Sequence, residues 1–149
     1  MTYRGTGQVA LPLEGVEKPL PHAGWAILTP PAELAALRAE VGAELYDPCP
    51  WPRPLGYDGL TADWGPVSYV NPLFWGGGIT AWVRKAIYER DKGKTVIMAL
   101  PVDGWVRLLI EACGGGDNIR YKPDWRWGTP EGEWKKPSRP LLLWVLRPR

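Results

Sequence analysis

The sequence contains little histidine, cysteine or phenylalanine, and each shortage excludes a class of site. Its 149 residues include one histidine, two cysteines and one phenylalanine. Neither Cys49 nor Cys113 has a second cysteine at the CxxC spacing of zinc sites, so we expect no bound metal. His22, between two apolar neighbours, is more typical of a surface residue than of a catalytic base.

Long apolar segments are missing as well. No apolar run reaches the ~18 residues that a membrane-spanning helix needs, and no signal peptide is recognisable. Two cysteines without the spacing of a disulfide framework are typical of reduced thiols. We therefore expect a cytoplasmic protein without a membrane partner.

Tryptophan, glycine and proline are abundant instead. The chain has 10 tryptophans, 18 glycines and 17 prolines, and 45% of its residues are hydrophobic. This length fits one domain with a real core, and the glycines and prolines predict many turns. Residues 1–28 lack a sustained hydrophobic period, so we predict an N-terminal arm at residues 1–28 and a folded domain at residues 29–149.

The hydrophobic pattern of that domain predicts helices and strands in alternation. Predicted helices lie at residues 29–42, 79–90 and 101–113. Predicted strands lie at residues 43–46, 67–70, 95–100, 118–121 and 141–146. Thr29 is expected to cap the first helix, because its hydroxyl can accept a backbone N–H bond. The alternation predicts an α/β domain with a mostly parallel sheet and helices on both faces.

The turn after the central strand carries the strongest candidate for chemistry. Asn71 and Pro72 end that strand, and Phe74 follows two residues later. In open α/β sheets, ligands bind at the carboxyl ends of the strands. An amide oxygen and a neighbouring backbone carbonyl can accept both N–H bonds of an exocyclic amine, and a ring can stack on its base. The alternative is an Asx-type turn with aromatic residues in the core.

A second acid-bearing turn follows the predicted strand at residues 43–46. There Asp47 and Pro48 come directly after the strand, so the carboxylate is expected at an edge of the sheet. Asp47 could line a ligand pocket at this edge, or it could cap the turn that it begins.

The C-terminal part of the chain is basic. Residues 118–149 carry eight basic and three acidic side chains, a net charge of +5, and the rest of the chain carries −3. Trp125, Trp127 and Trp134 are interspersed with these charges. Cations mixed with aromatic rings can meet a phosphate backbone and its bases; the alternative is a charged loop that faces solvent.

Several of these motifs occur in an order that resembles a known family. They are Thr29-Pro30-Pro31 with Leu34, Tyr46-Asp47-Pro48-Cys49, Asp58-Gly59 with Trp64, Asn71-Pro72-Leu73-Phe74, Trp82-Val83-Arg84-Lys85-Ala86, and Leu100-Pro101. This order resembles the phage-type DNA N6-adenine methyltransferases (Dam-like) over residues 29–146. The family usually has a second proline where Leu73 stands, and glycines where Pro50-Trp51-Pro52 stands.

The resemblance implies a site-specific DNA-methyltransferase (adenine-specific) with a single-domain Rossmann-like methyltransferase fold. Such an enzyme transfers a methyl group from S-adenosylmethionine to the exocyclic amine of adenine in double-stranded DNA. The resemblance also implies a phage or prophage protein in the cytoplasm of a bacterial host. The small size of the catalytic domain leaves the formation of an oligomer open.

Roles for individual residues are implied by the same resemblance. Cofactor contacts are implied for Thr29, Pro30, Asp47 and Pro48, and for either Asp58 or Asp63. Contacts to the target amine and its base are implied for Asn71, Pro72 and Phe74. DNA contacts are implied for Lys122, Arg126, Trp127, Lys135 and Arg139.

Two other functions remain open from the sequence. The first is a catalytically degenerate methyltransferase fold that serves as a DNA-binding module, which Leu73 and the missing glycines favour. The second is methyl transfer to another amine, in a glutamine side chain or in RNA, because one fold can carry several functions.

Overall fold

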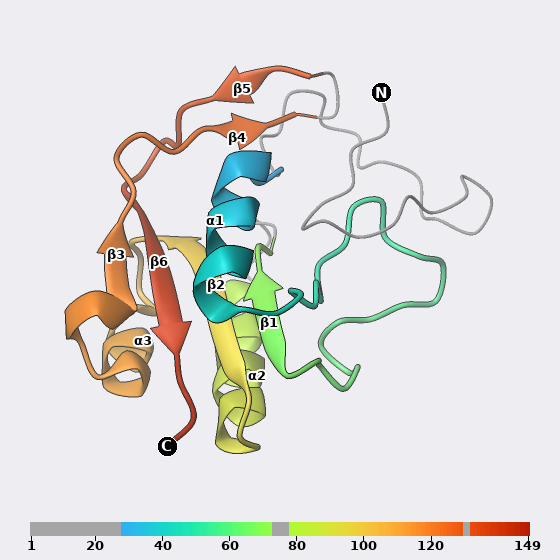
Figure 1. Cartoon of the computed structure of the whole chain (residues 1–149), viewed down its shortest axis with the longest axis vertical. Coiled ribbons are helices and arrows are strands. Elements are labelled where there is room, and N and C mark those ends of the chain that lie inside the picture. The colour runs from blue at the N-terminus through green and yellow to red at the C-terminus, as the bar shows by residue number, and fades with distance from the viewer. Residues whose placement is uncertain (1–27, 73–77, 130–131) are drawn as a thin grey trace.

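A computed structural model describes residues 28–72, 78–129 and 132–149 of the chain (Figure 1). The predicted arm at residues 1–28 lies outside this part, except for Leu28. The helices of the described residues are α1 (Pro31–Val41), α2 (Ile79–Asp91), α3 (Val106–Cys113) and a short 3-10 turn, Gly116–Asn118. The strands are β1 (Val67–Val70), β2 (Thr95–Pro101), β3 (Ile119–Tyr121), β4 (Trp127–Gly128), β5 (Trp134–Lys135) and β6 (Leu141–Leu146). None of these helices is long and apolar enough to cross a membrane.

The main sheet is mixed, with the strand order β1-β2-β6-β3. β1 and β2 are parallel, whereas β6 runs antiparallel to both β2 and β3. β4 and β5 form a separate two-stranded sheet. The prediction of a Rossmann-like methyltransferase fold with a mostly parallel sheet and helices on both faces is therefore wrong. A continuous apolar run such as β6 indicates burial on both faces of a sheet, but it does not encode the direction of the neighbouring strand.

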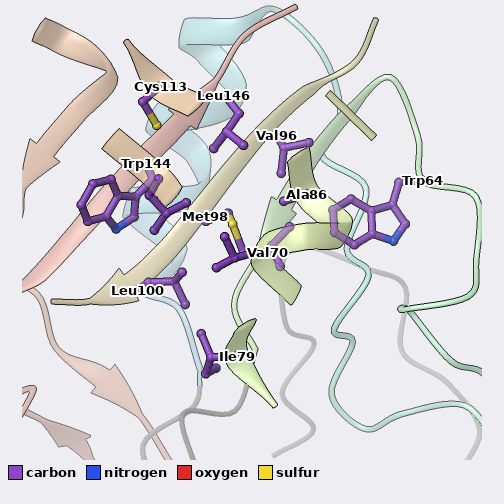
Figure 2. Packing of buried hydrophobic residues seen from close by; sticks show 12 residues of the cluster. Trp64, Val70, Ile79, Ala86, Val96, Met98, Leu100, Cys113, Trp144 and Leu146 are labelled. Carbon is purple, nitrogen blue, oxygen red and sulfur yellow. The ribbon is translucent and has the colours of Figure 1, made fainter. Parts of the chain in front are cut away.

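One face of the main sheet packs against α2 and α3. Its buried side chains include Val70 from β1, Met98 from β2 and Trp144 from β6, all at most 1% exposed (Figure 2). Val83 and Ala86 from α2 and Leu109 from α3 belong to the same cluster and are fully buried. The alternation of side chains along each strand sends the remaining residues to the opposite face.

The opposite face is covered differently. Leu34 and Leu37 of α1 pack there with Tyr69 and with two tryptophans, Trp125 and Trp127. Within the described residues α1 is the one helix on this face, and the tryptophans occupy the space beside it. A single helix and two tryptophans, one from β4 and one from the segment before it, thus cover this face together.

The strand predicted at residues 43–46 is present in a shorter form. Tyr46 makes a single parallel bridge to Ser68, with its N–H donating to the Val67 carbonyl at 2.8 Å. The Tyr69 N–H returns a 2.9 Å bond to the Tyr46 carbonyl. Residue 46 therefore extends the parallel side of the sheet beyond β1, and Asp47 comes to the same edge as Asn71.

The long loop between Asp47 and β1 is fastened to the far end of α2. Glu89 is fully buried and accepts hydrogen bonds from Lys85 at 2.7 Å and from Lys94 at 2.6 Å. Lys94 also binds the Trp64 carbonyl and, at 2.8 Å, Asp63. Burial acts to raise the pKa of Glu89, but the two lysines outweigh it and hold the pKa below its usual range.

Candidate functional site

Polar residues from three distant parts of the sequence meet at the carboxyl end of β1. We call Thr29, Asp47, Cys49, Tyr69 and Asn71 the Asn71 cluster. Thr29 directly precedes the first turn of α1, Asp47 follows the bridge beside β1, and Asn71 follows β1 itself. Because parallel strands end at the same edge, the chain brings an amide, a hydroxyl and a carboxylate together there.

Hydrogen bonds join the amide to the other elements. The Asn71 Nδ2 donates to the Thr29 Oγ1 at 3.1 Å. The same Thr29 oxygen lies 2.9 Å from the Tyr69 hydroxyl, and both residues are buried. Since Nδ2 faces Thr29, the Asn71 carbonyl oxygen, which is the other branch of the same planar amide, points in a different direction. Asn71 itself is half-buried, so the amide lies at the boundary between core and solvent.

Thr29 does not cap α1 as predicted. The N-cap residue is Pro30, and no side chain caps the helix. The Thr29 hydroxyl instead links the start of α1 to the end of β1 through Asn71 and Tyr69. The sequence pattern of an N-cap does not distinguish a threonine that caps its own helix from a threonine whose hydroxyl bonds to the end of a strand.

Asp47 and Cys49 form the second half of the cluster. Asp47 is 2% exposed, and its Oδ1 accepts the Cys49 N–H at 2.8 Å. Burial raises the pKa of the Cys49 thiol well above its usual range, and the charge of Asp47 raises it further. The backbone of Asn71 donates toward this sulfur and acts in the opposite direction, with less effect. The shift favours the protonated thiol at neutral pH, and the thiolate is the nucleophilic form of a cysteine.

Pro30, Pro48 and Pro72 all lie at this edge of the sheet. Pro30 is half-buried, and Pro48 and Pro72 are buried. Pro72 follows Asn71 directly, so its carbonyl is next to the amide in the chain. Phe74, the predicted stacking ring, lies outside the described residues.

The two remaining acids predicted for the cofactor have different partners. Asp58 is exposed, and its Oδ1 accepts the Leu60 N–H at 2.9 Å within a local turn. Asp63 pairs with Lys92 at 2.5 Å and Lys94 at 2.8 Å. These hydrogen bonds lower the pKa of Asp63 to about 2. Lys94 directly precedes β2, so Asp63 lies at the end of the parallel strands opposite to Asn71.

The residues predicted to contact DNA differ in their exposure. Trp127 is 4% exposed and packs edge-on against Trp125, with 5.2 Å between ring centroids. Lys122 pairs with Glu33 at 3.0 Å, and Arg139 pairs with Asp103. Arg126 and Lys135 are exposed. The structure therefore places four of the predicted cations near solvent, and it places the predicted ring in the core.

Sequence reasoning missed Tyr69 and Cys49 as members of the cluster. The hydrophobic pattern places Tyr69 in a buried apolar strand, although its hydroxyl requires a polar partner when it is buried. That requirement was the available signal, because a tyrosine two residues before Asn71 reaches the same edge of the sheet. Cys49 was part of the motif Tyr46-Asp47-Pro48-Cys49 in the family resemblance, but no role at the site was expected of it.

Comparisons of the chain with protein-family models, with curated proteins and with solved structures found no match. A function for the chain must therefore be argued from the geometry of the Asn71 cluster.

Proposed function

We propose that this protein transfers a methyl group from S-adenosylmethionine to the exocyclic amine of adenine in double-stranded DNA. The observation that supports this function best is the convergence of Thr29, Asp47 and Asn71. These residues are separated by up to 42 positions, yet two of them are hydrogen-bonded to one another at 3.1 Å. We also propose that the protein acts on phage or host DNA in the cytoplasm of a bacterial host.

The Asn71 amide supplies the acceptor that such a reaction needs. An adenine amine donates one N–H to the Asn71 carbonyl oxygen and the other to the Pro72 carbonyl. Because Thr29 holds Nδ2, the acceptor oxygen is positioned before the base arrives, and little reorganisation is required. As the new nitrogen–carbon bond forms, the methyl–sulfur bond of the cofactor would break and S-adenosylhomocysteine would leave. The methylated amine would then lose its proton to solvent, so a general base with a perturbed pKa is not required.

The residues beside Asn71 fit a cofactor with a positive charge and hydroxyl groups. Asp47 places a nearly buried carboxylate at the same edge, and carboxylates bind ammonium and hydroxyl groups by charge-assisted hydrogen bonds. When bound, S-adenosylmethionine supplies the electrophilic methyl group. Asp47 and Pro48 are the residues that would hold it, with Thr29 and Pro30 closing the site on the side of α1.

A second function, DNA binding without catalysis, is favoured by one specific contact. The Asp47 Oδ1 already accepts the Cys49 N–H at 2.8 Å, which is the role of an acid that caps a turn. If this is the whole role of Asp47, the cofactor has no carboxylate partner and the chain would bind DNA only.

Methyl transfer from isotope-labelled S-adenosylmethionine to duplexes of mixed sequence tests the proposal. We expect incorporation by the wild type and a loss of about 100-fold or more in Asn71→Ala, the size typical of removing one oriented catalytic hydrogen-bonding group. Asn118→Ala is the matched control, because it also removes an amide whose Nδ2 donates to the protein, at 2.9 Å to the Cys113 carbonyl.

Three outcomes separate the candidates. Incorporation that is lost in Asn71→Ala and kept in Asn118→Ala supports the proposal. Incorporation that survives Asn71→Ala contradicts the role of the amide. DNA binding by the wild type together with no thermal shift in saturating S-adenosylmethionine would select the binding module, because a bound ligand must raise the unfolding temperature.

A further inference from the structure

A basic pocket lies between the end of β3 and the start of β6. It has a volume of about 210 Å³, well above the ~30 Å³ that one water molecule occupies in the liquid. Its walls are formed by residues 121–123 on one side and residues 136–141 on the other. The pocket thus belongs to the segment that leaves β3 for the β4–β5 sheet and returns into β6 (Figure 1).

Every charged side chain that lines this pocket in the described part of the chain is basic. These side chains are Lys122, Lys136 and Arg139, and Ser138 also lines the pocket. Lys122 and Arg139 are each held by one carboxylate, from Glu33 and Asp103 respectively. Lys136 is exposed and makes no ion pair within the described residues. Among the described residues, no carboxylate therefore neutralises the charge of Lys136.

The walls of the pocket are stiff. Pro123, Pro137 and Pro140 are three of its lining residues, and proline fixes φ. The Lys122 N–H donates to the Leu141 carbonyl at 3.0 Å, and the Val102 N–H donates to the Pro140 carbonyl at 3.0 Å. Because the backbone is fixed on both sides, binding of an anion requires little ordering of the backbone around the pocket.

Two exposed aromatic residues accompany the cations. Tyr121 lines the pocket and is 61% exposed, and Trp134, in the neighbouring β5, is 49% exposed. Trp125 and Trp127, by contrast, are buried. Exposed rings beside unpaired positive charge are typical of surfaces that bind nucleic acid strands.

We propose that this pocket binds a backbone phosphate of a nucleic acid strand, with Lys136 as its principal charge and Tyr121 against the adjoining base or sugar. The pocket lies at the same end of the sheet as Asn71, because β6 starts opposite Pro101, where β2 ends. It is two to three strand spacings from β1, or ~10–14 Å. The assignment rests on the proposed function only in taking DNA as the partner.

Binding measured without methyl transfer tests the pocket independently of the reaction. The probe is a fluorescent G·C duplex, which contains no adenine, titrated without S-adenosylmethionine at several salt concentrations. Each phosphate contact contributes about 0.9 to the slope of log K against log salt concentration. We expect Lys136→Ala to lower that slope by about 0.9 and to weaken binding at low salt. We expect Lys136→Arg to restore the slope.

Arg84→Ala is the matched control for charge. Arg84 is also exposed and lies on α2 away from the pocket, and its replacement removes one positive charge in the same way. An unchanged slope in Arg84→Ala, with the loss confined to Lys136→Ala, supports the pocket. Equal losses in the two variants, or no loss in Lys136→Ala, would overturn it.

The pocket and the proposed reaction can fail separately. Methyl transfer that continues while Lys136→Ala binds DNA normally contradicts the pocket alone. If the slope of log K against log salt concentration depends on Lys136 but no methyl transfer occurs, the proposed reaction is contradicted and the proposed phosphate pocket is supported. A wild type that does not bind duplex DNA at low salt contradicts the pocket whatever the reaction.

Discussion

The Asn71 cluster and the tryptophan segment at residues 122–139 are organised in opposite ways. The cluster gathers residues that are far apart in the sequence, as in the contact between Thr29 and Asn71. The tryptophan segment separates residues that are adjacent, because Trp125 and Trp127 are buried while Arg126 between them is exposed. In an extended segment successive side chains point to opposite sides, so a local composition of cations and rings does not describe one surface.

The largest expected effect is in the tryptophan segment. Trp127→Ala removes a ring that is 4% exposed and packs on Trp125 and on the α1 face of the sheet. We expect a loss of about 3–5 kcal/mol in the free energy of unfolding, typical of large-to-small changes in a core. Urea denaturation of the two proteins measures this difference.

The control within the same segment is Trp134→Ala, since Trp134 is 49% exposed. We expect this change to cost about 0.5 kcal/mol, as for other surface substitutions. If both tryptophans prove equally dispensable for stability, the division of this segment into a buried and an exposed side is wrong.

The next effect concerns the ion pairs that fasten the loop leading to the Asn71 cluster. Glu89→Gln leaves Lys85 and Lys94 without their buried carboxylate, and we expect a loss of about 3 kcal/mol. Glu111→Gln breaks an exposed pair with Arg107, at 3.3 Å, and should cost less than about 0.5 kcal/mol. Thermal and urea unfolding at neutral pH provide the comparison.

The pH dependence of the free energy of unfolding provides a second measurement on Glu89→Gln. The pKa of Glu89 is lowered in the folded state, so its contribution to stability is complete above its ordinary value of 4.5 and is lost as the pH falls through the lower folded value. The difference between Glu89→Gln and the wild type should therefore shrink at acid pH. A difference that is constant from neutral pH to pH values below the folded pKa would contradict the electrostatic origin.

The smallest effect is expected in the Asn71 cluster itself. Thr29→Val replaces the hydroxyl shared by Tyr69 and Asn71 with a methyl group of similar shape, and we expect a loss of about 1 kcal/mol. Thr80→Val, at an exposed position of α2, is the control and should change stability little. Equal stability of the two variants would show that the shared hydroxyl does not hold the cluster together.

The positions of most regular elements could be predicted from the sequence. The predicted helix at residues 79–90 and the strand at 95–100 correspond to α2 and β2, and the strand at 141–146 corresponds to β6. These segments have a strong hydrophobic period or a continuous apolar run, and both patterns arise from burial. The helix predicted at residues 101–113 is confirmed only over its second part, α3.

The sheet and part of the site could not be predicted in the same way. The direction of β6 depends on the end of the sheet at which the chain re-enters after β3. No local sequence pattern between β3 and β6 specifies that end. The sequence leaves Asp58 and Asp63 as equal alternatives, but the ion pairs of Asp63 depend on Lys92 and Lys94, which lie about thirty positions away. Contacts over such separations are set by the assembled fold rather than by spacing.

Gly59 gives the loop before β1 a further property. A methyl group on its Cα would lie 2.0 Å from the Pro48 carbonyl oxygen and 2.7 Å from the Trp82 ring. A backbone carbonyl cannot rotate aside as a side chain can, so any larger residue would push the loop and the Asp47 turn apart. The loop can therefore approach the Asp47 turn this closely only because residue 59 has a hydrogen atom in place of a side chain. A single added carbon at residue 59 would displace the Asp47 carboxylate, twelve positions earlier in the chain.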